Sequence, residues 1–121
     1  MAVRALTPLQ NDDIRAALKA AEARTHLRFA VYVGRAEGAR REFAERLHAA
    51  LGAVADDAVL IMVDVDGRAL EIVTGERARR FITDGACQLV AVSMAGAFAA
   101  GDLTGGLVTG ISALAECATR G

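Results

Sequence analysis

The feature that most constrains the fold is a pair of apolar runs separated by a turn signal. Ala58 to Val65 is an apolar run rich in β-branched residues, Asp66-Gly67 follows it, and Arg68 to Thr74 is a second run. An Asp-Gly pair between two such runs favours a two-residue turn, because both central residues can adopt positive φ. We therefore expect an antiparallel β-hairpin. Its first strand is apolar on both faces and should be central in a sheet, whereas the second should lie nearer an edge.

A third strand is expected upstream of the hairpin. Arg28 to Gly34 encloses a short apolar run and ends at a glycine, as a strand covered on both faces does. Apolar residues at helical spacing predict one helix before it, over about Asp12 to Arg24, which begins at the capping residues Asn11 to Asp13. The same spacing predicts a helix after it, which Gly52 ends.

Two further helices are predicted towards the C-terminus. Thr83 and Asp84 can cap a helix that ends at Gly101, with Leu89 among its inward residues, and Thr104 can cap the last helix. The expected order of elements is therefore α-β-α-β-β-α-α. We predict an α/β fold, namely an α/β/α sandwich with a small mixed sheet, in which residues 1–121 form a single domain.

Charge and hydropathy exclude several classes of function. The net charge is -1 and basic residues are scattered among acidic ones, which argues against a nucleic-acid or anionic-membrane partner. Gly85 to Gly101 is uncharged but shorter than the roughly 20 residues of a membrane span, so we expect a buried helix there. Met1 to Leu9 lacks the features of a signal peptide, which predicts a cytoplasmic protein. Cys87 and Cys117 are expected to be free thiols.

Four stretches, in this order along the chain, resemble the TPM-domain family: Leu27 to Gly34, Ala58 to Gly75, Ile82 to Asp84 and Phe98 to Gly110. More closely still, the chain is similar to a small actinobacterial family of unknown function related to it. The resemblance implies an α/β/α sandwich on a mixed sheet. It also implies two kinds of activity, because TPM domains include a proposed acid phosphatase with a metal-binding acidic cluster and membrane-anchored assembly or repair factors.

A candidate metal site follows from the strand pairing. If pairing continues outward from Asp66-Gly67, Asp57 lies opposite Glu76, and like charges in such positions are unfavourable unless a cation or a basic group lies between them. Asp56 adjoins Asp57, and Asp84 can return to the same edge at the start of the next helix. We therefore predict an acidic cluster of Asp56, Asp57, Glu76 and Asp84 that binds Ca²⁺ or Mg²⁺ through oxygen, with no other cofactor indicated.

Arginines adjoin this acidic cluster. Arg77, Arg79 and Arg80 can bind phosphate oxygens beside a cation, which would make the chain a divalent-metal-dependent, phosphatase-like hydrolase. Alternatively, the aspartates are helix caps and the arginines neutralise their neighbours on a surface turn. No histidine or cysteine nucleophile motif accompanies the acidic residues, so the catalytic residues of such an enzyme are unknown.

The preferred interpretation is a non-catalytic binding or assembly module, because that function requires no site chemistry. Its partner would be a soluble protein or a second copy of the chain. Helical faces rich in alanine and glycine are the candidate contact surfaces, although the same residues pack well inside a domain. The sequence therefore leaves open whether the chain is an enzyme.

Overall fold

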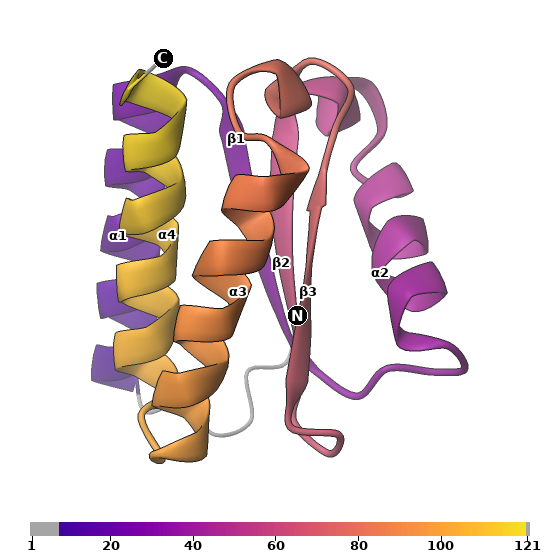
Figure 1. The fold of residues 1–121 in the computed structure, drawn as a ribbon, viewed down its shortest axis with the longest axis vertical. Coiled ribbons are helices and arrows are strands. Elements are labelled where there is room, and N and C mark those ends of the chain that lie inside the picture. The colour runs from indigo at the N-terminus through magenta and orange to yellow at the C-terminus, as the bar shows by residue number, and fades with distance from the viewer. Residues whose placement is uncertain (1–7, 121) are drawn as a thin grey trace.

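The computed structural model describes residues 8–120, so Met1 to Thr7, part of the segment expected to lack a signal peptide, lies outside it. The predicted order of helices and strands is confirmed, with two short 3₁₀ turns added (Figure 1). The elements are α1 (Pro8–Thr25), β1 (Arg28–Gly34), α2 (Arg40–Ala49), η1 (Gly52–Asp57), β2 (Ala58–Asp64), β3 (Ala69–Thr74), η2 (Ala78–Arg80), α3 (Asp84–Ala99) and α4 (Leu103–Arg120). No helix in this described part is long and apolar enough to cross a membrane.

The three strands form a mixed sheet in the order β1-β2-β3. β1 runs parallel to β2, with Arg28 opposite Ala58, and the connection between them contains α2. β2 and β3 pair antiparallel, with Asp64 opposite Ala69 and Val59 opposite Thr74. The central position of β2, the edge position of β3 and their register are all as predicted.

The turn of the hairpin differs from the expected two-residue form. The ladder stops at Asp64 and Ala69, and the residue with positive φ is Arg68, at 52°. Gly67 lies close to Asp64, since a Cβ there would be 2.7 Å from a carboxylate oxygen of that residue. Asp64 accepts a hydrogen bond from the Gly67 N–H at 3.2 Å, and the Val65 N–H donates to Gly34 of β1. These contacts with Asp64 and β1 widen the turn to four residues.

The helices cover both faces of the sheet. Figure 1 shows α1, α3 and α4 on one face and α2 alone on the other. All seven residues of β2 are buried, and the five from Val59 to Val63 divide between two cores. Val59, Ile61 and Val63 join the larger core with the three helices, whereas Leu60 and Met62 join the core beneath α2. The alternation follows from the two-residue period of a strand, and it explains why β2 is apolar throughout.

Three helix ends test the capping predictions. Thr83 caps α3 as expected, because its hydroxyl accepts the Ala86 N–H at 3.2 Å. The predicted start of α1 was wrong, since the helix already includes Pro8 and the expected caps Asn11 to Asp13 lie within it. The predicted cap of α4 was also wrong: Asp102 accepts the Gly105 N–H at 2.8 Å, whereas the hydroxyl of Thr104 is buried without a partner among the described residues. An ionised carboxylate is the better acceptor at a helix N-terminus.

Candidate functional site

One end of the sheet brings together most of the predicted site residues. η1 leads into β2 there, and β3 leads into η2, so the two connections meet at the open end of the ladder. The Gly75 N–H donates to the Ala58 carbonyl at 2.8 Å, and the Arg77 N–H donates to the Asp56 carbonyl at 2.9 Å. A Cβ at Gly75 would collide with the carbonyl groups of Ala55 and Asp56. Gly75 therefore allows the backbone contact that holds this end closed.

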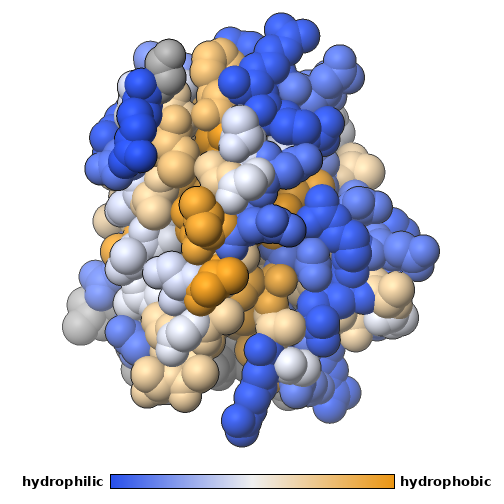
Figure 2. Space-filling view, viewed as in Figure 1, coloured by the Kyte–Doolittle hydropathy of each residue, from blue (hydrophilic) through white to orange (hydrophobic). Residues whose placement is uncertain are grey.

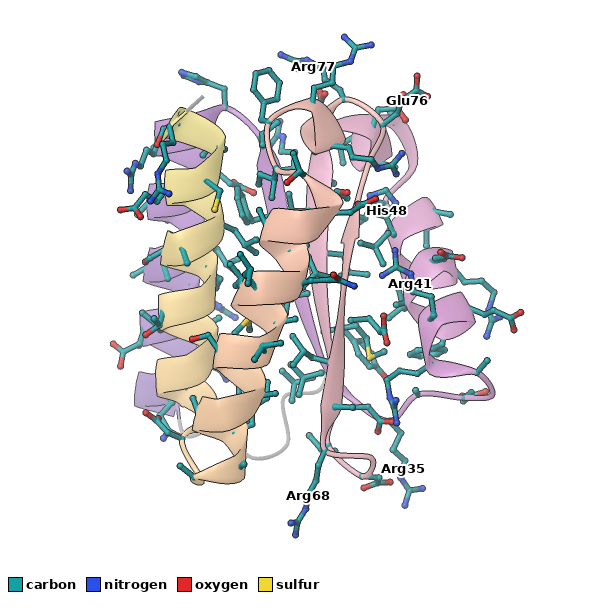
Figure 3. The ribbon with its side chains drawn as sticks, in the orientation of Figure 1. Arg35, Arg41, His48, Arg68, Glu76 and Arg77 are labelled. Carbon is teal, nitrogen blue, oxygen red and sulfur yellow. The ribbon has the colours of Figure 1, made fainter. Side chains whose placement is uncertain are left out.

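A shallow hollow of about 330 Å³ opens beside these connections. It is lined by Ala53, Asp56, Asp57, Glu76, Arg77 and Arg80, which include three of the four predicted acidic residues and two of the three predicted arginines. Arg77 bonds to an Asp57 oxygen at 2.9 Å, and its guanidinium lies 6.0 Å from the centre of the Phe81 ring. Figure 3 shows Glu76 and Arg77 at this end of the molecule. The positive group between the acidic residues is therefore Arg77.

The other two predicted site residues lie elsewhere. Arg79 donates to the Thr74 carbonyl at 2.8 Å, which directs its guanidinium to the edge of β3. Asp84 lines a separate hollow of about 330 Å³ with Arg41, Glu71, Cys87 and Gln88. Within residues 8–120, no three side chains of histidine, cysteine, aspartate or glutamate are placed to hold a metal ion together. The four predicted carboxylates are therefore divided between two hollows.

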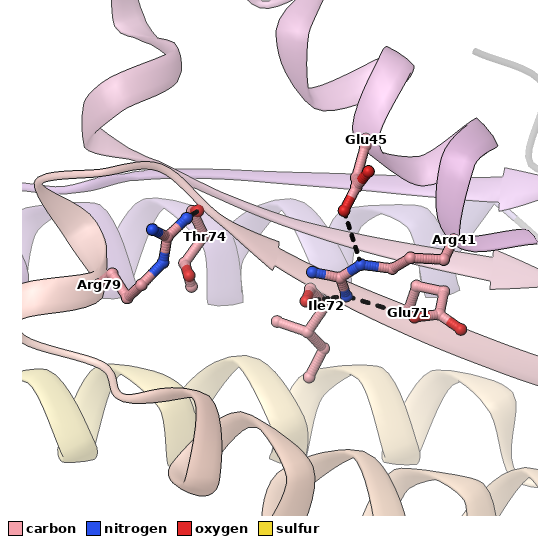
Figure 4. Close-up of polar contacts among 6 residues, drawn as sticks. All are labelled: Arg41, Glu45, Glu71, Ile72, Thr74 and Arg79. Atoms are coloured by element: carbon pink, nitrogen blue, oxygen red, sulfur yellow. Dashed lines mark hydrogen bonds and ion pairs between the residues drawn. The ribbon is translucent and has the colours of Figure 1, made fainter.

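An arginine that the sequence analysis did not single out organises the edge of β3. Arg41 of α2 donates from Nη1 to the Ile72 carbonyl at 3.0 Å and to Glu71 at 3.3 Å, and from Nε to Glu45 at 3.1 Å (Figure 4). Burial lowers the pKa of Arg41, but its bonds to Glu45 and Glu71 outweigh that effect and leave the pKa raised. The spacing of Arg41 and Glu45 was readable as a helical ion pair, whereas the contact with β3 was not.

The opposite end of the sheet carries a second group of charged residues. Asp64 is buried and accepts a bond from Arg40 at 3.3 Å, and the exposed Asp66 pairs with Arg35 at 2.5 Å. Figure 3 shows Arg35 and Arg68 at this end, far from Arg77. Both aspartates are thus paired with arginines, Asp66 on the hairpin turn and Asp64 at the buried end of β2.

Both cysteines are free thiols, and neither histidine lines either of these two hollows. Cys87 and Cys117 are free, as predicted. Burial, together with the Asp84 carboxylate, raises the pKa of Cys87 to about 11, so its thiol is protonated at neutral pH. His48 contacts the Ala58 carbonyl at 3.1 Å. His26 has a φ of 62°, in the connection between α1 and β1.

Among the described residues, the most exposed large apolar side chains lie on the outer face of α3. Leu89 is 76% and Val92 is 73% exposed, and Figure 2 shows hydrophobic surface over this helix. Cys87, Val90 and Met94 form the buried side of α3. The expectation of a buried helix was therefore wrong for this side of α3, and so was the inward placement of Leu89. The reason is that α3 packs on α4 and β3 while no described element covers its outer side.

The order of strands and helices, the register and this site geometry define an α/β domain built on a three-stranded mixed sheet. The chain belongs to the TPM domain family, whose model matches residues 2–117. No curated protein matches the sequence.

Solved structures share the fold, and two of them are similar over most of this chain. The NMR structure of the BA42 protein from the psychrophilic bacterium Bizionia argentinensis has a TM-score of 0.86 at 20% identity, and the match covers 99% of this chain and 86% of that one. The N-terminal domain of a protein from P. gingivalis has a TM-score of 0.81 at 19% identity, with 93% and 75% covered. At this level of identity the likeness shows the fold alone.

Proposed function

We propose that this TPM domain is a binding or assembly module whose contact surface is the outer face of α3. The observation that carries the proposal is the exposure of Leu89 and Val92 on a helix that has no charged residue after Asp84. Burying one such side chain contributes about 1.5–3 kcal/mol, and no desolvated charge opposes it on this face. The partner is a soluble protein or a second copy of the chain, in the cytoplasm.

The test replaces both side chains in the variant Leu89→Gln/Val92→Gln. Because these residues are exposed, the free energy of unfolding should stay within about 0.5 kcal/mol of the wild type. We expect the variant to lose self-association in sedimentation velocity, or to lose a partner that a tagged wild-type chain captures from its own cells. Val54→Gln, at a position 37% exposed in η1, is the matched control and should keep both. Unchanged association and capture by the double variant would contradict the proposal.

The hollow lined by Asp56, Asp57 and Glu76 favours a second candidate function, a divalent-metal-dependent, phosphatase-like hydrolase. Its support is the convergence of three carboxylates with Arg77 and Arg80 on one surface. For a cation to use Asp57, the guanidinium of Arg77 has to give way, since the two groups are ion-paired at 2.9 Å. We include Asp84 in the candidate set, although it lines a different hollow.

Thermal melts of chelator-treated protein with and without Ca²⁺ or Mg²⁺ test this second function. A cation that binds only the native state stabilises it by about 2.7 kcal/mol at 100 times its Kd. We expect that stabilisation to disappear in Asp57→Asn and to persist in the control Asp13→Asn on α1. Its loss in Asp84→Asn as well would assign the cation to all four acidic residues. Without any stabilisation, or without cation-dependent phosphomonoester hydrolysis, this candidate is excluded.

A further inference from the structure

The open edge of β3 presents unused backbone hydrogen-bonding groups. In an antiparallel ladder, alternate residues point their N–H and C=O groups towards the partner strand. The bond from the Gly75 N–H to the Ala58 carbonyl shows which residues of β3 do so. Leu70, Ile72 and Thr74 therefore direct these groups away from β2. Among the described residues, no side chain or loop carbonyl accepts a hydrogen bond from their three N–H groups.

Two of the outward carbonyls are covered by side chains rather than by backbone. Arg41 donates to the Ile72 carbonyl at 3.0 Å and Arg79 donates to the Thr74 carbonyl at 2.8 Å (Figure 4). The side chain of Arg41 is 51% exposed. Because both donors come from exposed arginines, the N–H groups of an added strand can replace them without opening the cores.

A hollow runs along this edge. Leu70, Glu71 and Ile72 form its β3 side, Arg41 of α2 lies at one wall, and Asp84, Cys87, Gln88 and Ala91 of α3 form the other. Ile72, which lines the hollow, is only 7% exposed, so this part of the floor is recessed between α2 and α3. Because α2 and α3 flank this edge on both sides, a single extended chain needs less clearance there than the edge of a second folded copy.

The charges around the hollow indicate the kind of chain that fits. Glu45 and Glu71 share the one guanidinium of Arg41. The exposed side chain of Asp84 makes no hydrogen bond or ion pair with any described residue. If an added strand displaces Arg41 from Ile72, the carboxylates of Glu71 and Asp84 remain beside it. A lysine or arginine on the bound chain would complement them.

We infer that the edge of β3 is a docking site for an extended peptide with a basic side chain, which joins the sheet as a fourth strand in place of the Arg41 and Arg79 contacts. Strand addition obtains its affinity from backbone hydrogen bonds and its specificity from alternate side chains. This site is separate from the outer face of α3. The alternative role of the two arginines is to seal an edge that would otherwise pair with other chains.

The probe is a blocked seven-residue peptide of alternating valine and threonine with a central lysine. We expect it to bind the wild-type chain in fluorescence anisotropy and to slow amide exchange at Leu70, Ile72 and Thr74 in NMR spectra. Arg41→Ala removes a competing donor and frees Glu71, so binding should tighten about three- to tenfold, the equivalent of one to two hydrogen bonds. Arg46→Ala, which removes a charge from the same helix, should leave the affinity unchanged.

Peptide controls separate strand addition from other binding. N-methylation of alternate residues should abolish binding, and glutamate in place of the lysine should weaken it at least about tenfold. Arg79→Ala is a second variant, which uncovers Thr74 and should also tighten binding, so the test stands if Arg41→Ala folds poorly. Leu89→Gln/Val92→Gln should bind the peptide like the wild type, which keeps this result independent of the α3 surface.

Four results would overturn the inference. Absence of peptide binding in both the wild type and the arginine variants would show that the edge is only sealed. Equal binding of the N-methylated peptide would exclude strand addition, and equal binding of the glutamate peptide would exclude the basic requirement. Protection of the β3 amides in Arg41→Ala without peptide, together with a doubled mass in light scattering, would make a second copy the occupant.

Discussion

Glycine is needed at position 75 because the space around its α-carbon is too small for a Cβ. Gly75 does not have a positive φ, so its backbone conformation is open to other residues. A Cβ there would nevertheless collide with the backbone of Ala55 and Asp56. Backbone cannot move aside as a flexible side chain can, so the connection that carries Asp56 and Asp57 depends on this glycine. The sequence by itself contains only a glycine after a strand and gives no sign of this steric constraint.

Gly75→Ala should therefore destabilise the chain by about 1–3 kcal/mol or more, because overpacking forces backbone shifts. The control is Gly96→Ala on α3, where nothing lies within 4 Å of an added Cβ. That change should stabilise by about 0.5–1 kcal/mol, since alanine favours the helix. Urea unfolding measures both, and a stability loss at Gly96 equal to that at Gly75 would contradict the steric explanation.

Asp64 is the buried carboxylate whose titration should affect stability. Burial raises its pKa, but hydrogen bonds from the Gly67 N–H and Arg40 outweigh burial, so the pKa lies below its ordinary value of 3.8. A depressed pKa contributes stability that is complete above the unfolded-state value and is lost as pH falls through the folded-state value. The contribution of Asp64 should thus be present at neutral pH and disappear in the acid range below 3.8.

Asp64→Asn should lower the free energy of unfolding at neutral pH by about 1–3 kcal/mol, the value of hydrogen bonds to a charged group. The difference from the wild type should shrink as pH falls below about 4, where both side chains become neutral. Urea unfolding across that range measures it. Asp66→Asn, in an exposed pair with Arg35, is the control and should change stability by under about 1 kcal/mol. A pH-independent difference at Asp64 would contradict the assignment.

At the scale of elements, the N-terminus of α4 shows which of two candidate residues caps the helix. Asp102 and Thr104 are both plausible capping residues, but only the Asp102 carboxylate reaches a free N–H, that of Gly105. Glycine at position 105 leaves room for it, because a Cβ there would overlap the carboxylate. The polar atom of Thr104 is buried instead, without a hydrogen bond to any described residue.

Asp102→Ala should cost about 1 kcal/mol of stability, as the loss of an N-cap does. Thr104→Val should be neutral or stabilising, because it replaces a buried, unpaired hydroxyl by a methyl group of similar size. Thermal unfolding of the two variants separates the roles. A larger loss from Thr104→Val than from Asp102→Ala would restore Thr104 as the cap.

At the scale of the whole molecule, β2 connects two cores that do not share side chains. Ile61 belongs to the core with α1, α3 and α4, and its neighbour Met62 belongs to the core beneath α2, each of them 0% exposed. Adjacent residues of one strand thus stabilise opposite layers of the sandwich. This division follows from the single-residue alternation of a strand inserted between helices.

Ile61→Val should cost about 0.5–1.5 kcal/mol and Met62→Ala about 2–5 kcal/mol. Because the two side chains contact different cores, the double variant should show additive losses within about 0.5 kcal/mol. A double-mutant cycle by urea unfolding measures the coupling. A coupling energy above about 1 kcal/mol would show that the two layers respond as one.

The sequence alone was sufficient for the order of elements, the hairpin register, the central place of β2 and the cap at Thr83. These features depend on periodicity and on neighbours a few residues apart, so local patterns contain them. It also placed Asp57 and Glu76 correctly at one end of the sheet, because the pairing of one residue in a ladder fixes the pairing of the residues that follow. Local patterns were ambiguous where two residues competed for one role, as at the cap of α4.

Only the tertiary structure decided which groups meet across elements. It separated Asp84 from the other acidic residues, directed Arg79 to Thr74, and placed Arg41 of α2 on the edge of β3. It also left the outer side of α3 uncovered, although the residues there read as core. The physical reason is that burial and long-range contacts depend on how the helices are positioned on the sheet, which the spacing of residues within one element does not specify.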